Sequence, residues 1–111
     1  MFTLERTGFG RAAALRWKTS NSPIEKIRIN AAKLQHHYCV RIRERMTNEL
    51  MTAKQFAEAS NISYDRLLKV LRGDIIMRLE DIAAADLILG EVSEFAYRDA
   101  MLLKRAEARR G

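Results

Sequence analysis

Two histidines and the single cysteine are the side chains most suited to chemistry, and they lie together at His36, His37 and Cys39. On a helix, His36 and Cys39 would share a face at a spacing that can hold a metal ion. A zinc site needs four ligands, however, and the sequence has no other histidine or cysteine to complete one. Nucleophilic catalysis by Cys39 would need a positioned base, which no pattern in the sequence supplies. The sequence therefore predicts no enzyme, no metal and no cofactor.

The positive charge is concentrated in one half of the chain. The net charge is +6, and residues 1–51 account for all of it with ten Lys and Arg against four acids, whereas residues 52–111 carry ten of each. A basic half suits a polyanionic partner such as DNA, RNA or an anionic membrane surface, although many basic proteins simply have solvated Lys and Arg.

No apolar run approaches the about 20 residues of a membrane span. The first residues also lack the apolar core of a signal peptide. The lone cysteine cannot form an internal disulfide, so we expect a cytoplasmic protein without a membrane partner.

The elements that position these residues are predicted to be helices. A length of 111 residues suits one domain, and one Pro with five Gly leaves few turns for a sheet. Residues 1–22 are expected to form a basic N-terminal arm that includes a short helix at Arg11–Lys18. Residues 23–111 are expected to form an all-α domain.

Helix starts and ends can be read from capping residues. Ser22-Pro23-Ile24-Glu25 predicts a capping box and a helix beginning at Pro23. One apolar stripe then continues almost to Met46, which makes this helix unusually long. Its members are Ile24, Ile27, Ala31, Leu34, Tyr38 and Ile42. Four more helices are predicted after the N-caps or breakers Thr52, Ser63, Gly73 and Gly90. They span Ala53–Ala59, Tyr64–Arg72, about Leu79–Leu89 and about Val92–Arg109.

The second and third of these helices form a predicted helix-turn-helix between Thr52 and Gly73. A small residue, Ala57, stands where the two helices would cross, which allows close approach. Asn61 stands in the turn, where a left-handed backbone is usual and Asn tolerates it well. Ile62 then enters the core. The apolar faces of the two helices comprise Phe56, Leu67, Val70 and Leu71.

The stretch from about residue 40 to residue 95 resembles the Cro/C1-type (XRE-like, lambda-repressor-like) family of phage and bacterial DNA-binding regulators. The resemblance is carried by Thr52, Phe56, Ala57, Ile62, Ser63, Leu67, Val70 and Gly73, followed by the apolar helix LEDIAAADLIL. Residues 42–45 look similar to the end of that family's first helix. The family usually has Gly at Asn61, often an apolar residue at Ser60 and often Gln at Ala53, so one common base contact is missing here.

The resemblance implies a five-helix domain that reads double-stranded DNA with a recognition helix at about residues 63–72. Base edges would be read by Ser63, Tyr64, Asp65, Leu68 and Lys69. Phosphates would be held by Thr52, Lys54, Arg66, Arg72 and Arg78. Separately, the N-terminal arm offers possible minor-groove or phosphate contacts from Arg6, Arg11, Arg16 and Lys18, with a self-packing or disordered tail as the alternative.

Self-association is expected, because one small domain binds DNA weakly and regulators of this type usually dimerise. The predicted interface is the last helix, whose apolar stripe is Val92, Phe95, Leu102 and Ala106. The stripe of the first helix could instead pair or close the core.

The function expected is a sequence-specific transcriptional regulator, in particular a repressor that acts as a homodimer. The alternative is an antitoxin-like or adaptor module, in which the helix-turn-helix serves as a scaffold for a protein partner. RNA binding ranks third, because the few aromatic residues do not form a stacking platform.

Overall fold

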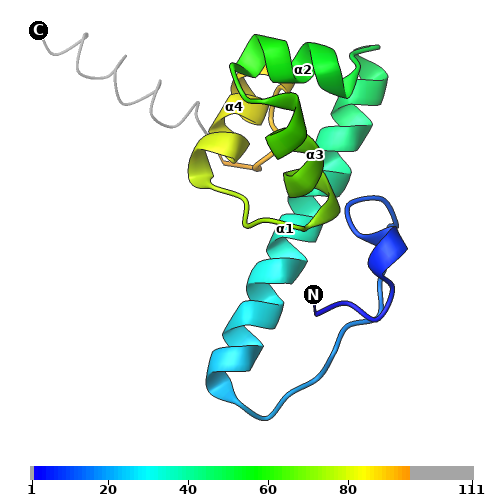
Figure 1. Ribbon diagram of the computed structural model, residues 1–111, viewed down its shortest axis with the longest axis vertical. Coiled ribbons are helices and arrows are strands. Elements are labelled where there is room, and N and C mark those ends of the chain that lie inside the picture. Colours follow the sequence, from blue (N-terminus) through cyan, green and yellow to red (C-terminus); the bar gives the residue numbers. More distant parts are fainter. Residues whose placement is uncertain (1, 96–111) are drawn as a thin grey trace, which may run out of the picture.

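The computed structural model describes residues 2–95, which are all-helical apart from loops and one isolated bridge. Figure 1 shows a long helix that runs the length of the molecule, with the shorter helices gathered around one of its ends. The elements are η1 (Arg6–Gly8, a 3-10 turn), α1 (Pro23–Asn48), α2 (Ala53–Ser60), α3 (Tyr64–Arg72) and α4 (Leu79–Leu89). Within this range, no helix is long and apolar enough to cross a membrane.

The predicted helix starts are confirmed at their capping residues. Ser22 accepts a hydrogen bond from the Glu25 backbone N–H at 3.4 Å, and Pro23 occupies the first turn of α1. The predicted capping box is only half formed, because the Ser22 backbone N–H donates to Oγ of Ser20 and not to Glu25. Thr52 and Gln55 form a complete capping box at α2, with hydrogen bonds of 2.9 and 3.1 Å. The boundaries of α1 through α4 therefore follow from local sequence.

The core forms where the second half of α1 meets α2, α3 and α4. Its buried apolar side chains include Cys39, Ile42, Met46, Phe56, Leu67, Val70, Leu71, Ala85, Leu89 and Val92. The stripe predicted along the first helix lies only partly in this core. Ile42 is buried, whereas Ile24, Ile27 and Leu34 are 65%, 67% and 56% exposed. The first half of α1 extends beyond the other helices, so it cannot bury its stripe against them (Figure 1).

The prediction of a short helix at Arg11–Lys18 is wrong. This segment is extended or bent, and its end pairs with the start of the chain through an antiparallel bridge between Thr3 and Trp17. Glu5 stabilises the extended form, because its carboxylate accepts from the Arg16 backbone N–H at 2.9 Å and pairs with the Arg16 side chain. The same contacts lower the pKa of Glu5.

The N-terminal segment is docked on α1 through an aromatic cluster. Phe9 is 4% exposed and makes edge-to-face contacts with Trp17 and His36. The Gly10 backbone N–H donates to Nδ1 of His36 at 2.8 Å. Burial lowers the pKa of His36, which favours the neutral imidazole that this hydrogen bond requires. The segment is thus part of the folded body.

The predicted fifth helix does not begin at Val92. Residues 91–95 are not helical, and Glu91 and Glu94 have positive φ angles. Val92 is completely buried, and its carbonyl accepts from Nε of Arg41 at 2.7 Å, so the chain is bound to α1 there. The rest of that predicted helix, including Leu102 and Ala106, lies outside the described residues.

Candidate nucleic-acid interface

The turn between α2 and α3 has the predicted geometry. Asn61 adopts the left-handed conformation, with φ 57° and ψ 35°, and ends α2. The backbone N–H of Ile62 then donates to the Ala57 carbonyl at 3.0 Å. Ser63 caps α3 by accepting from the Arg66 backbone N–H at 3.1 Å. These contacts fix the first turn of α3 relative to α2.

The packing between α2 and α3 also agrees with the prediction. Ala57 is 2% exposed, and the matched apolar residues Phe56, Leu67, Val70 and Leu71 are all buried. Ile62 is partly buried against the same core. The face of α3 that is not used for packing is left to solvent.

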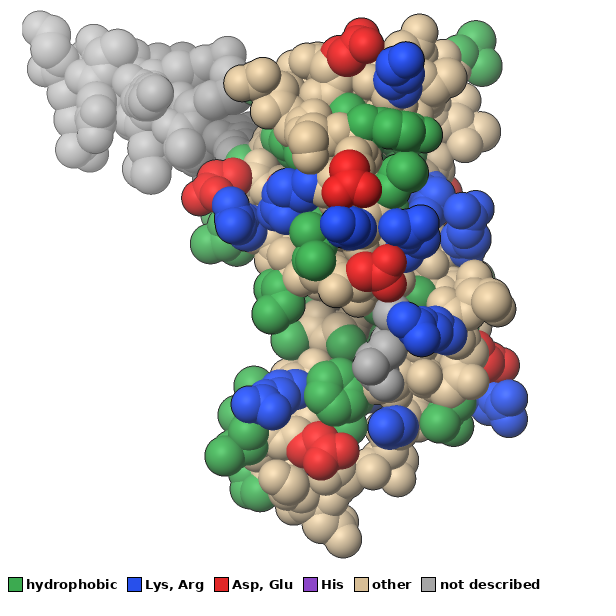
Figure 2. Space-filling view, in the orientation of Figure 1, with side chains coloured by type: hydrophobic (Ala, Val, Ile, Leu, Met, Phe, Trp, Pro, Cys, Tyr) green, Lys and Arg blue, Asp and Glu red, His purple; other side chains and the backbone are tan. Residues whose placement is uncertain are grey.

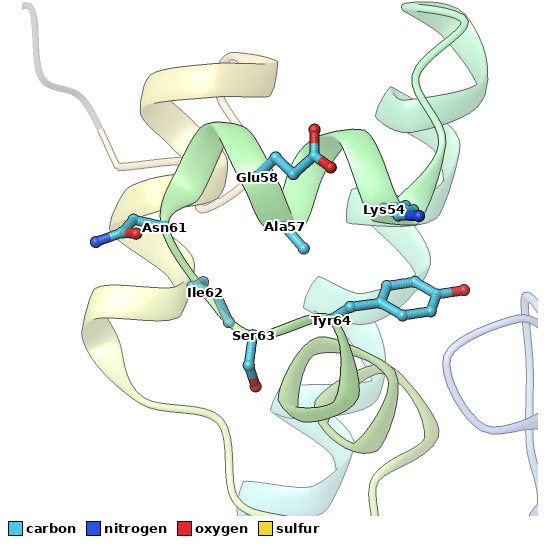
Figure 3. Close-up of a pocket in the computed structure, with 7 residues that line it drawn as sticks. All are labelled: Lys54, Ala57, Glu58, Asn61, Ile62, Ser63 and Tyr64. Carbon is cyan, nitrogen blue, oxygen red and sulfur yellow. The ribbon is translucent and has the colours of Figure 1, made fainter.

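The predicted base-reading residues lie together on this solvent face. Ser63, Tyr64, Asp65 and Lys69 are exposed, and Leu68 is half-buried. A hollow of about 300 Å³ separates the start of α3 from α2, and its lining includes Lys54, Glu58 and Tyr64. In Figure 3, Lys54 and Tyr64 lie on the same side of this hollow, with Asn61 at its other end. The structure therefore brings one predicted phosphate contact beside one predicted base contact.

Acidic side chains partly neutralise the charge of this face. Nζ of Lys69 lies 3.0 Å from the Asp65 carboxylate, and Nε of Arg72 lies 3.2 Å from that of Asp74. Figure 2 shows basic and acidic side chains interspersed across the middle of the same view. These pairs are largely solvated, so each contributes little stability and can exchange for a phosphate contact.

Arg66 has a partner inside the protein. Its guanidinium lies 2.6 Å from the Asp81 carboxylate, and the two side chains are only 24% and 10% exposed. The same carboxylate accepts from the Arg78 backbone N–H at 2.7 Å, at the start of α4. Arg66 therefore links α3 to α4. Sequence reasoning missed this ion pair because the two residues are distant in the chain.

The other predicted phosphate contacts are spread over two surfaces. Thr52 and Lys54 lie at the start of α2, where the Thr52 hydroxyl also caps the helix. Arg78 is exposed but lines a different groove, between α1 and residues 73–82. The two charged residues of this set, Lys54 and Arg78, make no ion pair within residues 2–95.

The arm residues are exposed on the docked N-terminal segment. Arg6, Arg11 and Lys18 are open to solvent, whereas Arg16 is paired with Glu5. A basic residue that was not predicted, Arg43 of α1, lines a hollow of about 450 Å³ together with Arg11. Nε of Arg43 is buried without a hydrogen-bond partner, and desolvation lowers its pKa. Only the tertiary fold brings these two arginines together.

The cluster of His36, His37 and Cys39 is divided among different contacts. His36 points into the N-terminal aromatic cluster, and His37 lies 3.2 Å from the Glu94 carboxylate. The Cys39 thiol donates to the Val70 carbonyl at 3.4 Å, and burial raises its pKa to about 12. No group of three or more candidate metal ligands occurs within the described part of the chain.

Comparisons with protein-family models, with curated proteins and with solved structures find no match to this chain. The resemblance to Cro/C1-type regulators remains a prediction from the sequence.

Proposed function

We propose that the protein is a sequence-specific double-stranded DNA-binding regulator that inserts α3 into the major groove. The observation that supports this proposal is the exposed start of α3, which carries a row of polar side chains and is held by the Asn61 turn and the Ser63 cap. An α-helix with its side chains is about 10–12 Å across, which suits a major groove about 12 Å wide. By occupying a promoter, such a protein would act as a repressor.

The roles of individual residues follow from their positions. Ser63, Tyr64, Asp65, Leu68 and Lys69 face the bases in this proposal. Backbone phosphates are contacted by Thr52, Lys54 and Arg72 on one side, and by Arg11 and Arg43 beside the N-terminal segment. Arg66 is removed from the phosphate contacts, because Asp81 binds its guanidinium.

The proposal is tested by selecting random duplex DNA with the purified full chain and sequencing the bound pool. Enrichment of one motif is expected. An inverted repeat with half-sites about 34 Å apart would indicate a two-fold dimer on DNA. If folded protein enriches no sequence at low salt, the DNA-binding proposal is wrong.

Lys69→Ala is expected to weaken binding to the selected site by about 1–3 kcal/mol if Lys69 reads a base. If Lys69 contacts only phosphate, all sequences should lose affinity alike and the salt slope should fall by about one. Fluorescence anisotropy over a salt series measures both quantities. Lys33→Ala is the matched control, because it removes an exposed lysine from α1. Unchanged affinity in Lys69→Ala would remove Lys69 from the interface.

A second function is favoured by the acid pairing on α3. Because Lys69 and Arg72 both have acidic neighbours, the helix-turn-helix also suits a scaffold in an antitoxin-like or adaptor protein. A stoichiometric protein partner recovered in a pull-down, together with weak DNA retention, would favour this function over the first.

A further inference from the structure

The first half of α1 has an apolar face that nothing in the described chain covers. Ile24, Ile27 and Leu34 are more than half exposed along it. The N-terminal segment packs against another side of the helix, where Ile29 and His36 are buried. In Figure 1 this part of α1 projects below the other helices, and Figure 2 shows hydrophobic side chains along the same lower edge.

The part of this face from Ala31 to Tyr38 is one wall of a groove of about 610 Å³, and residues 73–82 form the opposite wall. Phe2 and Phe9 of the N-terminal segment also line this groove. The apolar lining residues include Ala31, Leu34, Tyr38, Ile75, Ile76 and Met77. Gln35 holds the two walls together: its side-chain amide donates to the Ile75 carbonyl at 2.9 Å and accepts from the Met77 N–H at 3.0 Å. The groove is therefore preformed. On its rim, Ile76 and Leu79 are 85% and 83% exposed.

The spacing of the exposed stripe is symmetric about Ala31 to within one residue. Ile24 and Tyr38 each lie seven residues from it, and Ile27 and Leu34 lie four and three residues away on opposite sides. A two-fold axis through Ala31 would therefore place Ile24 of one antiparallel helix level with Tyr38 of the other, and Ile27 within one residue of Leu34. Ala31 itself is exposed and small, so two backbones can approach closely at the axis.

We infer that a second copy of this chain docks on this face, with the two α1 helices antiparallel and crossing at Ala31. In this arrangement Ile27 of each copy reaches the level of Gln35 in the other copy. That is where Ile75, Ile76 and Met77 form the far wall of the groove. The ridge of one copy thus fills the groove of the other, and the contact closes on itself.

The area available matches that of a small dimer interface. Burying one aliphatic side chain removes about 60–120 Å² of apolar surface. Six exposed or half-exposed apolar residues would contribute, namely Ile24, Ile27, Leu34, Tyr38, Ile76 and Leu79. Because these side chains are already partly buried and about 60% of an interface is apolar, the total per copy is about 400–800 Å², which reaches the size of a standard interface only at its upper end.

The charges of the two surfaces are complementary. Lys26 and Arg28 flank the apolar ridge near the start of α1, and both are exposed. Asp74 and Glu80 are exposed on the side of residues 73–82, where Arg78 is also exposed and Asp74 pairs with Arg72. In the antiparallel arrangement, Lys26 and Arg28 of each α1 lie toward Asp74 and Glu80 of the other copy. This disposition favours the antiparallel orientation over a parallel one, which would align the like-charged starts of the two helices.

Cysteine cross-linking tests the position of the axis. Ala31→Cys in the full chain is expected to give a disulfide-linked dimer under mild oxidation, since the two thiols would meet at the axis. The native Cys39 is buried and does not compete.

Lys33→Cys, on the side of α1 that faces Ala13 to Trp17, should stay monomeric on a non-reducing gel. Ile24→Cys should also stay monomeric, because antiparallel helices place its two copies at opposite ends. Self-linking of Ile24→Cys, or none of Ala31→Cys, would overturn the inference.

Sedimentation tests the interface energetically. The full chain is expected to be dimeric at micromolar concentration, and Ile27→Glu should weaken dimerisation by about tenfold or more, because it buries two charges in the contact. Leu87→Glu is the control at another exposed apolar residue, outside the face, and it should stay dimeric. A monomeric wild-type chain, or a dimer that Ile27→Glu leaves unchanged, would overturn the inference. Neither experiment contains DNA, so its failure is distinguishable from failure of the DNA-binding proposal.

Discussion

Gly10→Ala is expected to lower the free energy of unfolding by about 3 kcal/mol. Gly10 has a φ of +71°, a conformation that costs a residue with a Cβ about 1–2 kcal/mol. An added Cβ would also lie 2.4 Å from the Leu71 carbonyl oxygen and 3.1 Å from Cβ of Cys39. Because the first of these contacts is to backbone at the end of α3, relief requires movement of the whole N-terminal segment.

Urea denaturation measures this loss, and fluorescence of the single Trp17 reports the segment directly, because Trp17 packs on Phe9 and His36. Gly90→Ala is the control. Gly90 has a φ of +81°, but an added Cβ would meet nothing within 4 Å. Because its ψ of 126° lies outside the left-handed α region, Gly90→Ala should show the cost of a strained backbone conformation alone, about 1–3 kcal/mol. A loss of less than about 1 kcal/mol in Gly10→Ala would contradict the close packing of Gly10 against α3.

Asp81→Ala is expected to destabilise the fold by about 3 kcal/mol. The substitution leaves the mostly buried guanidinium of Arg66 without its partner, and it also removes the acceptor for the Arg78 N–H at the start of α4. Loss of one partner from a buried pair costs more than the pair itself contributes, because a buried charge remains unpaired. Thermal and urea denaturation measure the effect.

Arg66→Met separates the structural role of Arg66 from contact with DNA. It should lower stability while leaving the salt slope of DNA binding unchanged, whereas loss of a phosphate contact would reduce that slope by about one. Arg72→Met is the comparison at an exposed pair and should change stability by less than about 1 kcal/mol. A reduced salt slope in Arg66→Met would show that Arg66 leaves Asp81 to bind DNA.

The helix-turn-helix geometry was predictable because each of its determinants is local. The hydroxyls of Thr52 and Ser63 bond to backbone three residues ahead, and Asn61 and Gly73 tolerate the left-handed angles at the helix ends. Caps and turns of this kind depend on a few neighbouring residues, so the sequence alone specifies them. The exposure of Ser63 and Lys69 followed in the same way from the apolar face opposite them.

The remaining features depend on contacts between distant residues. Periodicity predicted that Ile24 and Ile27 share a face of α1, but it cannot show whether another element reaches that face. The sequence around Leu15 predicted a helix. The pairing of Glu5 with Arg16 and the burial of Phe9 instead hold the N-terminal segment in an extended conformation. The link from Arg66 to Asp81 likewise requires α3 and α4 to be placed first. Each of these results is set by tertiary packing.

Because Cys39 is buried in the core, the reactivity of its thiol reports how often the folded core opens. The thiol is completely buried among α1 and α3, and its pKa of about 12 leaves almost no thiolate at neutral pH. Alkylating reagents react with the thiolate, so labelling can occur only from states in which the core has separated. Because the chain has no second cysteine, the rate of mass increase in native buffer gives the population of those states without denaturant.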